Sequence, residues 1–337
     1  MFPGQNSQIP GMGEQAFNVS EEAKRIFYVG SETTGADLTE ICFGDQTDKL
    51  STSLVQPAII AAELANYQFL REKGLKPELL MGHSLGEIAT LGASGALSVE
   101  DVFRVTKVRA EVTERSSTTH PGIMAAVSGL RSEQVARILA SANKGVQKLG
   151  QSSTAYMANR NWRLEQVLSG HPDAIERVKR IVGHLKTLKY IDRATIITLR
   201  VPGAFHSPHN SGGVDEFREV FERVDKKIPK IMLLNNRGEY MINPGRYADY
   251  YSGQLVSGVE WDLMMHRAAS DGVRSFLEVT LSDDPKRATL SNFVIKEFPN
   301  HQLEETDLGR MIKINWVPED SESVLNRTEV PTSLQTG

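Results

Sequence analysis

The sequence has very little cysteine: Cys42 is the only one in 337 residues. A lone cysteine cannot form an internal disulfide, which suits a reducing cytoplasm and favours Cys42 as a small apolar side chain over a catalytic one. No run of the chain approaches the ~20 consecutive apolar residues that span a bilayer, and no basic segment followed by an apolar one opens it. We therefore expect a cytoplasmic protein that is neither secreted nor embedded in a membrane.

An excess of positive charge is also missing. Lys and Arg number 38 against 42 Asp and Glu, and the basic residues are scattered instead of forming the stripe that neutralises phosphates. With 40% hydrophobic and 24% charged residues, the composition is typical of globular proteins, and the length suffices for a core without covalent staples. These features argue against a nucleic-acid-binding protein and indicate an ordinary globular one.

The first part of the chain shows strand, turn and helix signals. The chain opens with the loop-like Phe2-Pro3-Gly4-Gln5, so we expect the first strand of an α/β domain to be very short or partly missing. Pro57 in a first helical turn and Gly74 at a helix end are typical boundary signals, and Ser98 opens a later helix with a capping signature. The predicted elements are helix 56–74, strand 79–81, helix 87–95 and helix 98–115.

The middle of the chain alternates short elements of both types. They are strand 123–127, helix 132–143, strands 155–157 and 167–168, helix 172–188 and strand 195–201. The order β-α-β-β-α-β is that of a ferredoxin-like subdomain, here inserted between the two halves of a larger domain. After this insertion the sequence predicts helices 216–224 and 258–269 and a strand at 231–234, and the acidic last twenty residues read as a poorly ordered tail.

Gly82-His83-Ser84-Leu85-Gly86 matches the G-x-S-x-G nucleophile elbow. In this motif a sharp strand-to-helix turn exposes a serine hydroxyl, and the glycines avoid clashes at the turn. The motif alone is weak, but here it lies between a predicted strand and a predicted helix, whose N-terminus directs N–H groups at a developing oxyanion. Ser84 is therefore either a nucleophile or a serine that merely caps the helix.

Arg109 lies on the valine face of helix 98–115, at a position where 3.6 residues per turn predicts burial. A buried arginine is costly unless it is paired. Three interpretations are open: an internal salt bridge or carbonyl contact, a side chain that snorkels at the edge of the stripe, or a site that awaits an anionic ligand.

A serine nucleophile needs a base within hydrogen-bonding distance, usually histidine. His206 follows a predicted strand and lies in a loop, where ligands are commonly bound. His83 neighbours the serine, but consecutive residues on an elbow point apart, so we expect it to pack or to bond the backbone. Five other histidines lie in helical or exposed contexts: His120, His171, His184, His266 and His301.

Together these motifs resemble the malonyl-CoA:acyl-carrier-protein transacylases, a family that includes the acyltransferase domains of fatty-acid and polyketide synthases. Five segments carry the resemblance between Phe2 and about Val279. They are F-P-G-Q-N-S-Q at 2–8, G-H-S-L-G-E at 82–87, Arg109, G-A-F-H-S at 203–207, and Gln254-Leu255 followed by Val259-Glu260-Trp261. The histidine motif looks most like that of free-standing, trans-acting acyltransferases.

The resemblance implies a catalytic role for five residues. Ser84 would attack the thioester, with His206 as general base and then general acid. The backbone carbonyl of Gln254 would orient the imidazole, which makes a Ser-His dyad. Gln5 and the backbone N–H of Leu85 would form the oxyanion hole.

Two further roles and three departures follow from the same resemblance. Arg109 would hold the malonyl carboxylate, since its planar fork bonds both oxygens, and Phe205 would disfavour α-methyl substrates. Asn6 replaces a glycine, with little effect expected because asparagine tolerates a left-handed backbone. His209-Asn210 and the segment 281–284 also depart from the family pattern, at the pocket floor and at the carrier-protein surface.

The resemblance implies an α/β fold with an α/β-hydrolase-like domain over 1–121 and 202–317, a ferredoxin-like subdomain over 122–201 and a flexible tail over 318–337. The implied reaction moves a malonyl group from malonyl-CoA, a coenzyme A thioester, to the phosphopantetheine thiol of an acyl carrier protein, through acyl-Ser84 in a ping-pong sequence. We expect a monomer without a bound cofactor or metal, and without nucleic-acid or membrane partners.

Other functions of the same fold remain open. The chain could pass larger acyl groups between carrier proteins, hydrolyse stalled acyl groups, or serve as an inactive scaffold that docks carrier proteins. Arg109 argues against the hydrolase, which would gain nothing from a buried guanidinium. Retention of Gln5, Ser84, Arg109 and His206 argues against the scaffold.

Overall fold

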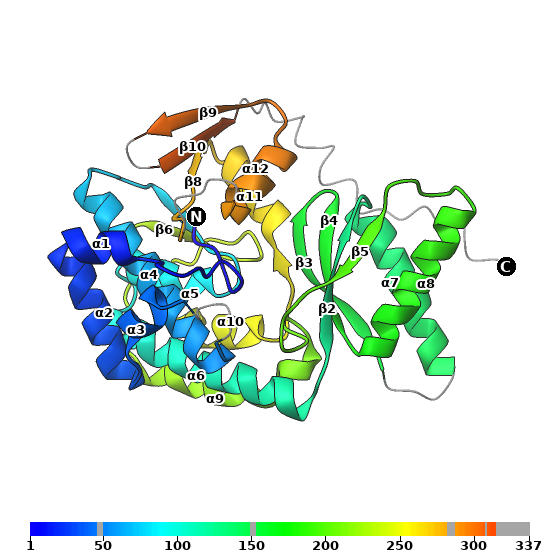
Figure 1. Ribbon diagram of the computed structural model, residues 1–337, viewed down its shortest axis with the longest axis horizontal. Helices are drawn as coiled ribbons and strands as arrows, with labels where there is room; N and C mark the ends of the chain where they lie inside the picture. Colours follow the sequence, from blue (N-terminus) through cyan, green and yellow to red (C-terminus); the bar gives the residue numbers. More distant parts are fainter. Residues whose placement is uncertain (46–49, 149–152, 282–286, 307–308, 315–337) are drawn as a thin grey trace.

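The computed structural model describes residues 1–45, 50–148, 153–281, 287–306 and 309–314. The predicted tail at 318–337 and most of segment 281–284 lie outside these residues. Within them, no helix is long and apolar enough to cross a membrane. The molecule has two lobes: helices make up most of one, and a sheet backed by two helices forms the other, on the right of Figure 1.

The first lobe is mainly helical. Its helices are α1 (Glu14–Val19), α2 (Glu21–Thr34), α3 (Leu38–Phe43), α4 (Thr52–Glu72), α5 (Gly86–Ala93), α6 (Val99–Thr119), α9 (Val214–Arg223), α10 (Tyr247–Gln254), α11 (Trp261–Ser270) and α12 (Thr289–Glu297), with the 3₁₀ turns η2 (Pro208–Gly213) and η3 (Pro244–Arg246). Its strands are β1 (Leu79–Met81), β6 (Met232–Leu234), β8 (Ser275–Leu277), β9 (His301–Thr306) and β10 (Gly309–Ile314). β1 and β6 pair in parallel, and β8-β10-β9 form an antiparallel sheet.

The second lobe is built from the middle of the chain. Its elements are β2 (Ile123–Ser128), α7 (Ser132–Lys148), β3 (Ala155–Trp162), β4 (Glu165–Gly170), α8 (Pro172–Thr187) and β5 (Thr195–Thr198). The strands lie in the order β5-β2-β4-β3 and are antiparallel, with α7 and α8 on one face (Figure 1). β7 (Val259–Glu260) joins the sheet in parallel beside β3, so this sheet continues into the first lobe. The predicted element order of this lobe is confirmed. β2, α7, β3 and β4 are longer than predicted, whereas the strand predicted over 195–201 already ends at Thr198.

The beginning of the chain lies between two strands of the first lobe. Phe2 donates its N–H to the carbonyl of Met81 (2.9 Å) and accepts from the N–H of His83 (2.9 Å), which makes a single parallel bridge to Gly82. On the other side, the Met1 amino group donates to the carbonyl of Leu277 at 2.7 Å. The expected short first strand is therefore a two-residue segment, and it places Gln5 next to the elbow.

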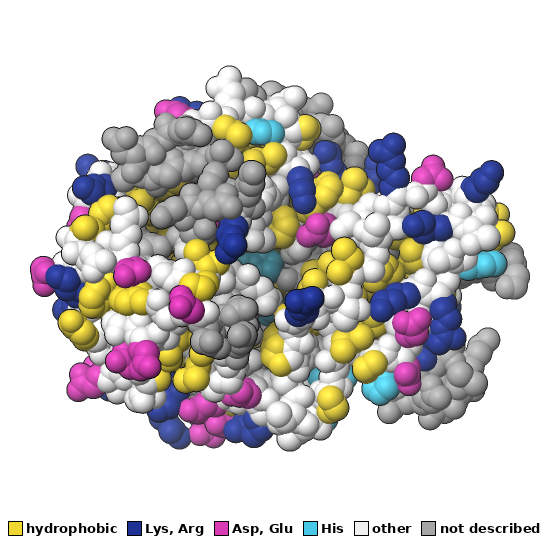
Figure 2. Space-filling view, in the orientation of Figure 1, with side chains coloured by type: hydrophobic (Ala, Val, Ile, Leu, Met, Phe, Trp, Pro, Cys, Tyr) yellow, Lys and Arg dark blue, Asp and Glu magenta, His cyan; other side chains and the backbone are white. Residues whose placement is uncertain are grey.

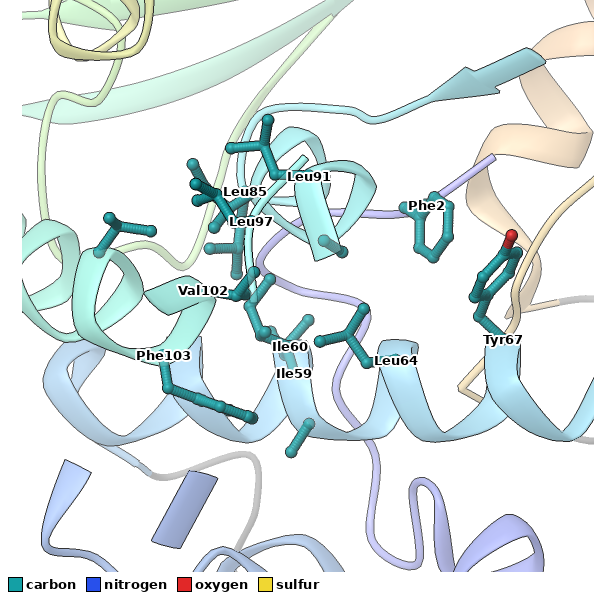
Figure 3. Packing of buried hydrophobic residues seen from close by; sticks show 14 of the residues in the cluster. Phe2, Ile59, Ile60, Leu64, Tyr67, Leu85, Leu91, Leu97, Val102 and Phe103 are labelled. Atoms are coloured by element: carbon teal, nitrogen blue, oxygen red, sulfur yellow. The ribbon is translucent and has the colours of Figure 1, made fainter. Parts of the chain in front are cut away.

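The core of the first lobe is centred on α4. Figure 3 shows Ile59, Ile60 and Leu64 of α4 pointing toward leucines and Val102 of the α5 and α6 region, with Phe2 beside Tyr67. All of these side chains are buried. Burial of apolar side chains on this scale is the main force that holds the elbow against α4.

Two predicted boundaries were wrong for identifiable reasons. α4 begins at Thr52, because the N–H of Val55 already bonds the carbonyl of Ser51 at 2.9 Å. Pro57 therefore lies in the second turn instead of the first. The helix predicted over 258–269 begins at Trp261, because the two preceding residues form β7.

Candidate active site

The elbow has the predicted strand, turn and helix. β1 ends at Met81, α5 begins at Gly86, and Ser84 between them has a left-handed φ of 54°. A Cβ on Gly82 would overlap the backbone of Gly86, and one on Gly86 would overlap the carbonyl oxygen of Phe2. Both glycines are thus required by close backbone contacts, as the motif predicts.

Leu85 and Gln5 are the two residues that the resemblance implies for the oxyanion hole. Leu85 is the N-cap residue of α5, so its N–H belongs to the end of a helix where donors lack intrahelical acceptors. Gln5 lines the same cavity as Ser84, and its Oε1 accepts a hydrogen bond from Gln56 Nε2 at 3.2 Å. Asn6 has a φ of 82°, the left-handed conformation expected at this departure from glycine.

His206 lies against the serine. Its Nε2 is 2.6 Å from Ser84 Oγ, and its Nδ1 lies 3.1 Å from the carbonyl oxygens of both Gln254 and Ser257. Two carbonyl acceptors at Nδ1 favour the tautomer that carries its proton there, which leaves Nε2 free to accept the serine proton. Burial, and next the positive charge of Arg109, lower the pKa of His206 to about 3, so the imidazole is neutral near pH 7.

His83, the alternative base, bonds elsewhere. Its Nε2 lies 3.2 Å from Asn161 Oδ1 and 3.3 Å from Asn159 Nδ2, and its ring packs 5.7 Å from that of Trp261. Burial lowers its pKa to about 4. His83 therefore packs, as expected, but its side chain bonds two asparagine side chains instead of the backbone.

Arg109 reaches the serine from α6. It is only 4% exposed, so a snorkelling side chain is excluded. Its guanidinium donates to three neutral oxygens: Gln56 Oε1 (2.8 Å), Gln254 Oε1 (3.2 Å) and Ser84 Oγ (3.2 Å). Among the described residues it forms no ion pair, and its Nε has no partner. Burial lowers its pKa to about 10, against the raising effect of the Glu87 charge, so it is a cation near pH 7.

A cavity of about 90 Å³ opens over these groups. Its lining is partly polar and partly apolar. The apolar lining consists of Met124, Val167, Leu199, Val201, Phe205 and Leu255. Figure 2 shows a hollow between the two lobes with a histidine side chain at its floor. The arrangement can hold an acyl group whose carbonyl lies at Ser84 and whose far end meets a buried cation.

Known proteins share this arrangement of the chain. The acyl transferase domain family matches residues 1–196, more than half of the sequence. The malonyl CoA-acyl carrier protein transacylase of Staphylococcus aureus is 30% identical over 290 residues, which cover 83% of this chain and 87% of that protein. This chain belongs to the malonyl-CoA:acyl-carrier-protein transacylase family. The Bacillus subtilis (strain 168) transacylase is 27% identical over 281 residues, 83% of this chain and 85% of that protein.

Solved structures of the transacylase family have the same mixed α/β fold. The crystal structure of the malonyl CoA-acyl carrier protein transacylase from Clostridium perfringens matches with a TM-score of 0.78 at 26% identity, over 89% of each chain. The structure of the Streptococcus pneumoniae protein matches with a TM-score of 0.77 at 27% identity, over 88% of this chain and 91% of that one. The similarity therefore extends across both lobes.

Sequence reasoning missed a buried carboxylate of this transacylase site. Glu87 accepts from Asn236 N (2.8 Å), Asn236 Nδ2 (2.7 Å) and Tyr250 Oη (2.8 Å), and from Gln254 Nε2. Burial raises its pKa to about 7, while these donors and Arg109 oppose the shift. The side-chain amides of Gln56 and Gln254 were missed as well. A polar residue within a predicted buried helix, as at Gln56, was the available signal.

The departures from the transacylase pattern have different outcomes. Asn210 is buried in the cavity wall and donates Nδ2 to the carbonyl of Ala204 at 2.9 Å. Leu281 is buried, and the residues after it are not described. Cys42 is fully buried, its Sγ lies 3.4 Å from the carbonyl of Ala58, and burial raises the pKa of its thiol, which fits the apolar interpretation. Among the described residues, no three His, Cys, Asp or Glu side chains gather as a metal site would need.

Proposed function

We propose that this chain transfers a malonyl group from malonyl-CoA to the phosphopantetheine thiol of an acyl carrier protein through an acyl-Ser84 intermediate. One observation carries the proposal. Ser84 Oγ lies within hydrogen-bonding distance of a neutral base, His206 Nε2 (2.6 Å), and of a buried cation, Arg109 Nη2 (3.2 Å). The names of the related transacylases supply the acyl group, the donor and the carrier.

The first half-reaction acylates the serine. Ser84 Oγ attacks the thioester carbonyl while its proton passes to His206 Nε2, and the carbonyl of Gln254 stabilises the imidazolium through Nδ1–H. The tetrahedral oxyanion accepts hydrogen bonds from the Leu85 N–H and the Gln5 amide. Collapse breaks the C–S bond, and His206 returns its proton to the departing coenzyme A thiolate.

The second half-reaction repeats these steps with the carrier thiol. The thiol gives its proton to His206 Nε2 as sulfur attacks the acyl ester. Collapse then breaks the C–O bond, and the proton returns to Ser84 Oγ. No step needs a resident cofactor, and we propose that the enzyme acts as a monomer by a ping-pong sequence.

Arg109 would select substrates that have a free carboxylate. Its charge is buried, its Nε has no partner among the described residues, and its acceptors are neutral. A substrate carboxylate would provide the missing anion, and charge-assisted bonds of this kind are about twice as strong as neutral ones. Phe205, in the apolar wall, would limit branching at the α-carbon.

We also propose the finer description of the fold. The strand order β5-β2-β4-β3 with α7 and α8 on one face supports a ferredoxin-like subdomain over 122–201. The parallel β1 and β6 with an elbow between strand and helix support an α/β-hydrolase-like domain over 1–121 and 202–317. The nucleophile and base both come from this larger domain.

Intact mass measurement after mixing the protein with malonyl-CoA tests the function. The expected result is a malonyl adduct that persists until an acyl carrier protein with its phosphopantetheine arm is added. Ser84→Ala should show no adduct while keeping its fold, because it removes one hydroxyl and little packing. Rapid loss of the adduct to water would indicate a hydrolase. An adduct retained by Ser84→Ala, or none in the native protein, would contradict the proposal.

A further inference from the structure

Gln56 is a fully buried amide on α4, a helix whose buried side chains are mostly apolar. A buried amide without hydrogen bonds destabilises the fold. Both ends of this one are bonded to groups of the active site: Oε1 accepts from Arg109 Nη1 at 2.8 Å, and Nε2 donates to Gln5 Oε1 at 3.2 Å. The Gln56 side chain therefore connects Arg109, the cation beside Ser84, with Gln5, a residue proposed for the oxyanion hole.

A second amide holds the other side of the guanidinium. Gln254 Oε1 accepts from Arg109 Nη2 at 3.2 Å, and its Nε2 donates to the carbonyl of Ser84 at 2.9 Å and to the Glu87 carboxylate. Each amide oxygen faces Arg109 because its NH₂ group is donated in another direction. We call Gln56 and Gln254 the amide cradle.

The cradle keeps a carboxylate away from Arg109. The charge of Glu87 raises the pKa of Arg109, but Gln254 lies between the two side chains and bonds both. Asn236 and Tyr250 donate the other hydrogen bonds that the Glu87 carboxylate accepts. Amide oxygens fix the guanidinium plane without neutralising its charge. A carboxylate in the same place would form an ion pair and compete with any anionic substrate.

We propose that Gln56 is a positioning residue with two functions, one for each end of its amide. Its oxygen holds Arg109 in place while leaving the charge available to a substrate carboxylate, and its NH₂ group donates to Gln5 Oε1 and so holds the segment that carries Gln5 into the cavity beside Ser84. This inference rests on the proposed malonyl transfer and identifies what sets its selectivity for acyl groups with a free carboxylate.

Two variants of Gln56 separate the two functions. Gln56→Leu removes both contacts, and Gln56→Glu removes the bond to Gln5 but places a carboxylate beside Arg109. The measurement is the single-turnover rate of acyl-enzyme formation with malonyl-CoA and with acetyl-CoA. Acetyl rates should fall by a similar factor in both variants, because both lose the contact with Gln5. The malonyl rate should be about tenfold lower in Gln56→Glu than in Gln56→Leu, because only the new carboxylate pairs with Arg109.

The double variants Gln56→Glu/Arg109→Ala and Gln56→Leu/Arg109→Ala test the assigned cause. Without the guanidinium, the new carboxylate has no partner to neutralise, so these two double variants should give equal malonyl-to-acetyl ratios. Gln166→Glu is the matched control, since Gln166 is also a fully buried glutamine, but its side chain, among the described residues, bonds only the backbone carbonyls of Trp162 and Arg163. It should leave the ratio unchanged.

Each outcome decides between the cradle and a purely structural Gln56. Equal malonyl-to-acetyl ratios in the Glu and Leu variants, or an equal shift in Gln166→Glu, would overturn the inference while leaving malonyl transfer intact. If Gln56→Glu does not fold, Gln56→Asn replaces it: its shorter amide should lower the malonyl rate more than the acetyl rate, and an unchanged ratio overturns the inference. Failure of the native protein to form malonyl-Ser84 would instead contradict the function.

Discussion

The elbow and the amide cradle meet at Ser84 but are built in different ways. The elbow consists of five consecutive residues, 82–86, fixed by backbone contacts and by glycines that have no room for a Cβ. The cradle joins Arg109 to residues 53 and 145 positions away, through side-chain amides alone. Backbone geometry thus places Ser84, and side-chain contacts hold the cation beside it.

The two regions also differ in backbone conformation, because Gln56 and Gln254 of the cradle lie in helices. Ser84 of the elbow and its partner His206 have left-handed φ values of 54° and 56°, which typically cost about 1–3 kcal/mol each and persist only where surrounding contacts enforce them. The carbonyl of Ser84 accepts from Glu87 N (3.2 Å) and from Gln254 Nε2 (2.9 Å). Gln254 therefore supports both regions, through its backbone at His206 and through its side chain at Ser84 and Arg109.

A change in the elbow should have the largest effect. Gly86→Ala places a Cβ against the carbonyl oxygens of Phe2 and Pro3, which are backbone atoms and cannot turn away. We expect loss of acyl-enzyme formation by about 100-fold or more and a clear fall in melting temperature, since a 1 Å displacement of a reacting group is enough for such a loss. Mass spectrometry and thermal unfolding measure the two effects.

Gly183 in α8 provides the matched control. A Cβ at this position meets no atom within 4 Å, so Gly183→Ala should raise stability by about 0.5–1 kcal/mol through helix propensity and leave activity unchanged. If Gly86→Ala behaved like Gly183→Ala, the elbow would not depend on its backbone contacts.

A change in the cradle should alter selectivity more than rate. Arg109→Ala removes the buried cation, so acylation by malonyl-CoA should fall at least about tenfold more than acylation by acetyl-CoA, because charge-assisted hydrogen bonds are worth about 1.5–3 kcal/mol each. Parallel single-turnover assays with both thioesters give the ratio. Equal losses with the two substrates would make Arg109 a structural residue.

The pH dependence of acylation links the two regions. His206 is a base only when neutral, and burial together with the Arg109 charge holds its pKa at about 3. As the pH decreases from 7 to 5, the rate of acylation by acetyl-CoA should therefore not show the fall that protonation of a histidine with an ordinary pKa would cause. Arg109→Ala removes a nearby positive charge, which raises the pKa of His206 and moves the acid limb to higher pH. A shift to lower pH, or a native rate that halves near pH 6.5, would contradict this assignment.

The sequence predicted the elbow well because its information is local. Two glycines four positions apart, with an apolar strand before them and a helix after them, determine the turn, and the valine periodicity of α6 places Arg109 inside the protein. His206 could be chosen among eight histidines only through the family resemblance. Its second carbonyl partner, Ser257, has no signal in the sequence, since any residue supplies a carbonyl.

The cradle could not be predicted for a related reason. The side chains of Gln56, Glu87 and Gln254 lie on three helices that meet only in the folded chain, and which end of an amide faces Arg109 depends on every other donor around it. The predicted bounds of some elements were also wrong, by a few residues. Val259 and Glu260 fit a helical pattern, but pairing with β3 makes them a strand.

The smallest expected effect concerns Phe205, which belongs to the apolar lining of the cavity together with Val201 and Leu199. It directly precedes His206, so its ring limits the space beside the reacting carbonyl. An apolar pocket distinguishes one methyl group by only about 1–3 kcal/mol, so native protein should prefer malonyl-CoA over methylmalonyl-CoA without excluding the latter. Phe205→Ser should narrow the difference in kcat/KM between them. Both substrates carry the carboxylate that Arg109 would bind, so this contact contributes equally to the two values of kcat/KM and cancels in their ratio. The ratio therefore tests only the apolar lining of the cavity. An unchanged ratio in Phe205→Ser would place the selective contact elsewhere, with buried Asn210 the next residue to vary.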